Sequence, residues 1–128
     1  MAVQTAIKRE ERILLGHPAA DAAKDPRWQA IIKVGEFIED EPSEVWKFAR
    51  KWGSHANKDL RAAIATCLVE HLLECHFAQI IPLVELACDE SKRFADTTAM
   101  CWEFGQTETS ENRRRFRRLL RRVRKRSP

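Results

Sequence analysis

Apolar residues recur at helical spacing from one end of the chain to the other. Between residues 2 and 15 they stand three, four or seven positions apart, and the run stops at Gly16. Spacings of three and four bring side chains onto one face of an α-helix. No segment alternates apolar and polar residues convincingly, as a half-buried strand would. The pattern therefore predicts an all-α protein.

Capping residues and helix breakers divide this pattern into successive helices. Asp25-Pro26 is typical of a helix start, with Asp at the N-cap and Pro at the first helical position. Ser43, Asn57 and Ser91 are suited to cap later helices in the same way. The stretch 16–26 is linker-like. The predicted helices cover residues 2–15, 26–38, 43–52, 58–75, 76–87 and 91–104, and a basic segment follows Ser110.

Each predicted helix has an apolar face that we expect to be buried. The stripe on the helix 58–75 consists of Leu60, Ile64, Cys67, Leu68, His71 and Cys75. Val69 and Leu73 lie opposite this stripe, so the helix should be covered on more than one face. The remaining core is expected to include Trp28, Ile32, Trp46, Trp52, Leu86, Trp102 and Phe104.

Two segments of the chain resemble each other at the length of a helical-hairpin repeat. When Asn57 is aligned with Ser91, Cys67 meets Cys101 at the same offset. Periods of roughly 30–47 residues are typical of helical-hairpin repeats. Short connections make successive helices antiparallel neighbours, in a bundle or a solenoid, and the repeat favours the solenoid. We expect a short right-handed α-solenoid with an Arg-rich C-terminal helix.

The third and fourth predicted helices resemble the repeats of a known protein family. Val45-Trp46-x-Phe48-Ala49-x-x-Trp52-x-Ser54-x-x-Asn57-x-x-Leu60-Arg61-x-Ala63 resembles a HEAT-type helical repeat. It is especially similar to the HEAT-like repeats of the DNA alkylation-repair glycosylases, and the resemblance covers residues 42–105. Those enzymes are considerably longer, and they often have a second Arg where this chain has Ala62. No position here matches their catalytic carboxylate, so the resemblance supports the fold and not the glycosylase activity.

Charge is distributed unevenly along the 128 residues, a length that fits one domain. Residues 1–112 hold 13 of the 23 basic residues and all 19 acidic residues, a net charge of −6. Residues 113–128 hold the other 10 basic residues and no acid. An asymmetry of this kind suggests a polyanionic partner for the basic end.

Cysteine usage and hydropathy bear on the compartment. The four cysteines form no CxxC pair, and the N-terminal residues hold no continuous apolar core of a signal peptide. No stretch approaches the roughly 20 apolar residues of a membrane span. We therefore expect a cytoplasmic protein with reduced cysteines and no membrane span.

The spacing of Cys67, His71 and Cys75 raises the question of a zinc site, because thiolate and imidazole are zinc ligands. Positions i and i+8 lie about 12 Å apart along a helix, and all three residues belong to the apolar stripe, so core packing is favoured.

The acidic run 39–41 indicates a solvated turn or a docking site for a basic segment. Because no nucleotide-binding or hydrolase motif occurs, we expect no catalytic residue, metal or cofactor.

The basic end carries the strongest functional signal. Residues 113–126 are RRRFRRLLRRVRKR, in which four apolar residues form a narrow helical stripe. The stripe is suited to cap the core, while the arginines are suited to phosphate contacts. A membrane-surface or groove-binding helix is a further interpretation. The predicted nucleic-acid-binding residues are Arg113, Arg114, Arg115, Arg117, Arg118, Arg121, Arg122, Arg124, Lys125 and Arg126.

These observations favour a helical-repeat domain over residues 1–110, followed by a basic amphipathic helix or tail over 111–128. The function they predict is a non-catalytic scaffold whose basic segment engages nucleic acid or an acidic protein surface, with a possible protein partner on the concave helical face. One alternative is a reduced alkylation-repair glycosylase, which needs Asp59, Asp96 or Glu103 in a cleft lined by Trp and Arg. Another is a protein–protein adaptor whose tail only caps the solenoid.

Overall fold

The chain is all-helical over the residues that its computed structural model describes, which are 2–16 and 25–126. Most of the predicted linker 16–26, and the side chain of Arg126, lie outside this description. No strand occurs in the described ranges, so the predicted all-α class is confirmed.

The elements are α1 (Ala2–Leu14), α2 (Pro26–Gly35), α3 (Pro42–Trp52), α4 (Lys58–Ile64), the π-helix η2 (Ala65–Val69), α5 (Glu70–Glu90), α6 (Lys92–Ala99), the 3₁₀ turn η3 (Gly105–Glu108) and α7 (Ser110–Arg126).

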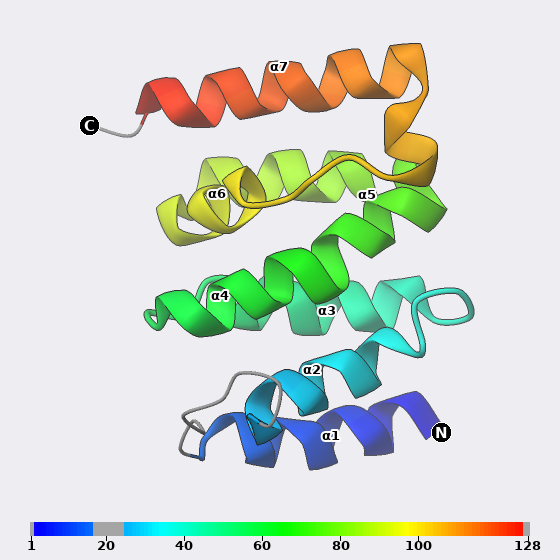
Figure 1. Ribbon diagram of the computed structural model, residues 1–128, viewed down its shortest axis with the longest axis vertical. Helices are drawn as coiled ribbons and strands as arrows, with labels where there is room; N and C mark the ends of the chain where they lie inside the picture. The colour runs from blue at the N-terminus through cyan, green and yellow to red at the C-terminus, as the bar shows by residue number, and fades with distance from the viewer. Residues whose placement is uncertain (1, 17–24, 127–128) are drawn as a thin grey trace.

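The helices are stacked along the long axis of the molecule, with α1 at one end and α7 at the other (Figure 1). Helices that are two apart in the chain touch each other: α1 contacts α3, α2 contacts α4, α3 contacts α5, α4 contacts α6, and α5 contacts α7. Short turns also bring α3 against α4 and α5 against α6, and the longer connection through η3 brings α7 against α6. Each new helix is thus laid on the preceding part of the stack.

Three of the four predicted caps determine where helices begin, whereas α3 starts at Pro42 and the predicted cap at Ser43 was wrong. Asp25 accepts a hydrogen bond from the Arg27 backbone N–H at 2.9 Å, and Asn57 accepts one from Leu60 N–H at 3.1 Å. Ser91 caps α6 through a bond from Phe94 N–H at 3.1 Å. Each side chain satisfies an N–H group that has no partner within its own helix.

The central segment Lys58–Glu90 runs through α4, η2 and α5 without leaving helical structure. Ile64 and Leu68 are fully buried, as the sequence predicts. Val69 and Leu73 are also buried, which confirms that this segment is covered on more than one face. The contacts of η2 with α2, α3 and α6 supply that cover.

A kink at His76 divides this segment where the sequence predicts a new helix. His76 has φ −141° and ψ 47°, outside the helical region. The Gln106 amide bridges the kink, because it accepts from Phe77 N–H and donates to the Cys75 carbonyl, both at 2.9 Å. The His76 ring reaches the Ile38 carbonyl at 2.9 Å. Backbone groups next to the kink are therefore paired by a side chain.

The π-helix η2 changes which residues of the central segment face the core. A π turn holds more residues per turn than an α turn, so burial continues at strict intervals of four, from Leu60 to Leu72. Cys67, His71 and Cys75 consequently lie at the edge of the core and are partly exposed. The predicted core position therefore holds only in part: Cys67 and Cys75 pack against the core from its edge and are not fully buried in it.

Helix α6 ends at Ala99, five residues earlier than predicted. The chain then crosses the face of the molecule in extended form to reach η3 (Figure 1). An extended chain advances about 3.3 Å per residue against 1.5 Å in a helix, which suits this crossing. Trp102 is 70% exposed and Phe104 is also exposed, so their predicted burial was wrong.

The other residues that the sequence places in the core differ in how far they are buried. Trp46 and Trp52 are buried, as expected. Trp28 is half-buried and donates from its indole N–H to Asp59 at 3.1 Å. Ile32 and Leu86 are exposed, contrary to the prediction, because each lies on the outer edge of its helix.

We expect Ile64→Ala to lower the free energy of unfolding by about 2–5 kcal/mol, because truncating a fully buried aliphatic side chain leaves a cavity. Urea denaturation followed by circular dichroism measures this change. Thr66→Ala, at an exposed position two residues away, is the control and should cost much less. A loss below about 0.5 kcal/mol for Ile64→Ala would contradict the packing described here.

Candidate nucleic-acid interface

Helix α7 lays its apolar stripe on the core. Phe116, Leu119, Leu120 and Val123 are all buried, although this helix is the most basic segment of the chain. The stripe closes the end of the stack against α5, α6 and η3. The opposite side of α7 faces outward. One helix therefore covers the core and presents a cationic surface.

Four arginines of α7 are engaged by acids of the body. Arg115 forms two hydrogen bonds to Glu85, at 3.0 and 2.7 Å, and these bonds raise the pKa of its guanidinium. Glu103 pairs with both Arg117 and Arg113, with shortest N–O distances of 3.0 and 3.3 Å. The fourth pair joins Arg122 to Asp89 at 3.2 Å. These contacts fasten α7 to the acidic body.

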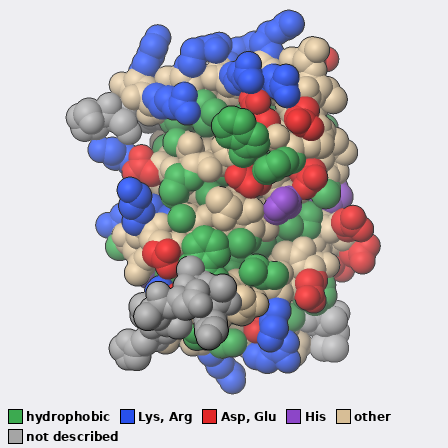
Figure 2. All heavy atoms as spheres, in the orientation of Figure 1, with side chains coloured by type: hydrophobic (Ala, Val, Ile, Leu, Met, Phe, Trp, Pro, Cys, Tyr) green, Lys and Arg blue, Asp and Glu red, His purple; other side chains and the backbone are tan. Residues whose placement is uncertain are grey.

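The remaining described cations of α7 have no acidic partner among residues 2–16 and 25–126. They are all exposed, and they are Arg114, Arg118, Arg121, Arg124 and Lys125. Figure 2 shows Lys and Arg side chains gathered along the edge that α7 forms, with hydrophobic side chains below them on the same face. The ten predicted binding residues thus lie on one helix, and the ion pairs separate the nine whose side chains are described into two sets. Their role in binding stays a prediction.

A groove of about 370 Å³ separates α7 from the segment that follows α6. Its polar wall comes from Arg117, Arg121 and Arg124 on α7, and from Glu103 on the crossing segment. Trp102 lines the same groove. The sequence predicts Trp102 as a core residue and not as part of a site, because apolar spacing continues through residue 104 and gives no sign that α6 ends early.

The position of Trp102 depends on a buried carboxylate. Glu70 is buried on α5, and its Oε2 accepts the Trp102 backbone N–H at 2.6 Å. Burial raises the pKa of Glu70, and the hydrogen bond from Trp102 opposes part of that rise. Cys101 is held nearby, with its thiol 3.6 Å from the Ala65 carbonyl. The backbone beneath the indole is therefore fixed to the central segment.

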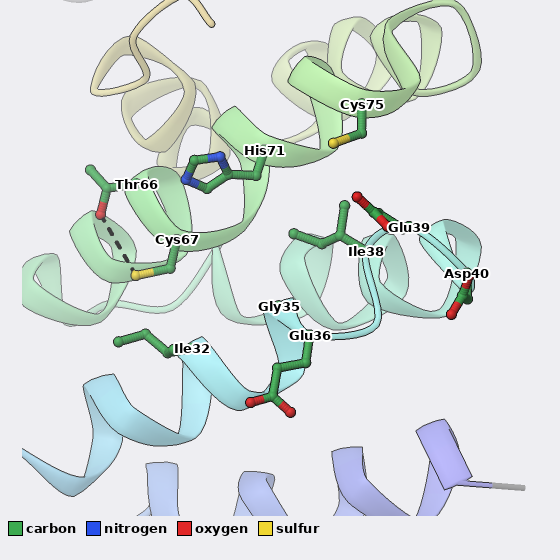
Figure 3. A pocket seen from close by; sticks show the side chains of 10 residues that line it. All are labelled: Ile32, Gly35, Glu36, Ile38, Glu39, Asp40, Thr66, Cys67, His71 and Cys75. Carbon is green, nitrogen blue, oxygen red and sulfur yellow. Dashed lines mark hydrogen bonds between the residues drawn. The ribbon is translucent and has the colours of Figure 1, made fainter. Parts of the chain in front are cut away.

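A second hollow, of about 540 Å³, contains the cysteines and the histidine singled out from the sequence (Figure 3). Cys67, His71 and Cys75 line one wall, opposite Glu36 and Glu39 from the end of α2 and the following turn. The described residues include no group of three His, Cys, Asp or Glu side chains arranged to hold a metal ion.

The groups in this hollow are poorly suited to nucleophilic chemistry. Burial, with nearby carboxylates, raises the pKa of both Cys67 and Cys75. Both thiols are therefore protonated at neutral pH, and the thiolate is the reactive form. His71 is engaged by Glu74 at 2.6 Å and stacks on Phe104.

Comparisons with protein-family models, curated proteins and solved structures return no match to this chain. The segment Lys58–Glu90 is long and apolar enough to cross a membrane by length and composition, and half of its most apolar window is buried in the fold. Core helices of soluble proteins meet the same criterion. The absence of a membrane span stays a prediction.

We expect Leu119→Ala to lower the thermal midpoint, with a loss of about 2–5 kcal/mol, because Leu119 is buried under the end of the stack. Differential scanning calorimetry measures this effect. The neighbouring exposed Arg118→Ala is the matched control and should change stability by less than about 0.5 kcal/mol. Equal midpoints for the two variants would mean that α7 does not cap the core.

Proposed function

We propose that this protein is a non-catalytic helical scaffold whose C-terminal helix binds nucleic acid or a related polyanion in the cytoplasm. The proposed architecture is a short right-handed α-solenoid of HEAT-like hairpins. Its support is the regular contact of helices two apart in the chain, from α1–α3 through α5–α7. Such contacts arise when helical hairpins are stacked one on another.

One observation carries the binding proposal: α7 presents five exposed cations that no acid of the described chain neutralises. These are Arg114, Arg118, Arg121, Arg124 and Lys125. Guanidinium groups form bidentate hydrogen bonds with phosphates, and cations that displace condensed counterions gain affinity for nucleic acid. The buried stripe keeps these charges on a rigid helix, which reduces the ordering cost of binding.

The number of exposed cations predicts the salt dependence of binding. If five cations reach phosphates, log K against log[salt] should have a slope of about −4 to −5 on duplex DNA, at roughly −0.9 per contact. Replacing Arg114, Arg118, Arg121 and Arg124 by Gln should flatten the slope to about −1. The thermal midpoint should stay near that of the wild type, because these side chains make no ion pair with any residue that the structure describes. Fluorescence anisotropy with a labelled duplex measures the slope.

The matched control removes the same charge from the arginines that are paired to the body. Replacing Arg113, Arg115, Arg117 and Arg122 by Gln should lower the thermal midpoint, since Glu85, Glu103 and Asp89 lose these partners. It should leave most of the slope intact. If binding is undetectable at low salt, or if both sets flatten the slope equally, the proposal is wrong. The adaptor whose tail only caps the core would then be favoured.

A glycosylase remains a second candidate because of Glu103. This carboxylate lies in a groove lined by Trp102 and three arginines, whereas Asp59 and Asp96 are not among the lining residues. Both Glu103 oxygens are engaged by guanidinium groups, which argues against an active carboxylate.

We expect no base release from alkylated duplex DNA, measured by chromatography of the free base. The reason is that arginine guanidinium groups engage Glu103, the one acid among the described residues that line the groove. Release that disappears in Glu103→Gln would contradict the non-catalytic proposal and favour the enzyme.

A further inference from the structure

Electrostatic binding by the cations of α7 does not explain why Trp102 is exposed. Its side chain is 70% exposed, although an indole is one of the largest apolar groups a protein can bury. Glu70 holds its backbone N–H on one side, and the ion pairs of Glu103 with Arg113 and Arg117 hold the next residue. The segment is thus fixed on both sides of an indole that faces solvent.

A strip of arginines runs along α7 beside this indole. Arg117, Arg121 and Arg124 share the groove with Trp102. A neighbouring hollow of about 220 Å³ also includes Arg117 and Arg121, and it adds Arg114. These four positions are spaced three, four and three residues apart, so they share one helical face and span about 15 Å.

The electrostatics of the groove favour an anion. Among the described residues that line it, Glu103 is the one acid, and both of its oxygens are engaged by arginines. Arg121 and Arg124 make no ion pair within the described chain, so their guanidinium groups face the groove without a counter-charge. A volume of about 370 Å³ lies within the range of roughly 300–1,000 Å³ found for small-ligand pockets.

We infer that this groove binds single-stranded nucleic acid, with one base stacked on Trp102 and the adjoining phosphates hydrogen-bonded to Arg121 and Arg124. The inference rests on the proposed polyanion binding and adds stacking to it. Every base has a π-face, so an aromatic platform beside a cationic track binds single strands with little sequence preference. A duplex hides its base faces, and it therefore gains from the arginines and not from the indole.

The test uses the full chain and three labelled probes of equal length: oligo(dT), an abasic strand with the same phosphates, and a duplex. Trp102→Ala should weaken oligo(dT) binding roughly 5- to 100-fold. It should leave the abasic strand and the duplex nearly unchanged. Trp102→Phe should retain most of the affinity, because the phenyl ring still stacks. Leu15→Ala, an exposed apolar residue at the other end of the stack, is the matched control and should change nothing.

A second measurement detects stacking directly. Oligo(dT) should quench the indole fluorescence of the wild type, and Trp102→Phe should lose that quenching while still binding. The abasic strand should quench neither protein. An oligo(U) probe that behaves like oligo(dT) would place RNA in the same class of ligand.

The outcomes separate this inference from the function on which it rests. If Trp102→Ala binds all three probes as tightly as the wild type does, the stacking site is wrong and polyanion binding stands. If the wild type binds neither oligonucleotides nor polyphosphate at low salt, both are wrong. If Trp102→Ala weakens polyglutamate binding by the same factor as oligo(dT), the groove takes an acidic protein segment, which overturns the inference.

Discussion

Burial of the central segment Lys58–Glu90 is the interaction on which the rest of this structure depends. Its apolar side chains point in several directions, so no single neighbour can cover them. α2, α3, α6 and α7 each take one part of that surface. Each Å² of apolar surface removed from water contributes roughly 25 cal/mol, so this shared burial stabilises the whole stack. The larger hollow and the groove beside α7 both border this central segment or the chain packed on it.

The larger hollow and the groove beside α7 each lie where helical regularity breaks. The π turn at Ala65–Val69 brings Thr66 and Cys67 to the rim of the larger hollow, beside the end of α2. The early end of α6 opens the groove beside α7 and leaves Trp102 on its wall. π turns inside α-helices are frequent at functional sites.

Helix α7 combines opposite demands in a single segment. Ten like charges on one short stretch repel each other, and a helix composed of them is unfavourable alone. The acids Glu85, Asp89 and Glu103 neutralise part of this charge where α7 meets the body. The buried stripe attaches α7 to the core, and the remaining described cations stay exposed. The acidic body thus supplies counter-charge for its own basic helix.

The sequence by itself determined the all-α class, the helix starts at Asp25, Asn57 and Ser91, and the helix break at His76. These features depend on capping, breakers and spacing within a few residues, which a local pattern records. The sequence also predicted correctly which residues of α7 form its buried apolar stripe. Only the tertiary structure decided how far Trp102 and Cys67 are exposed. Trp102 is exposed because Glu70, 32 residues away, takes its backbone N–H and α6 cannot continue. Cys67 lies at the edge of the core because it falls within the π turn, which packs against α2, α3 and α6. Neither cause can be predicted from the local spacing of apolar residues.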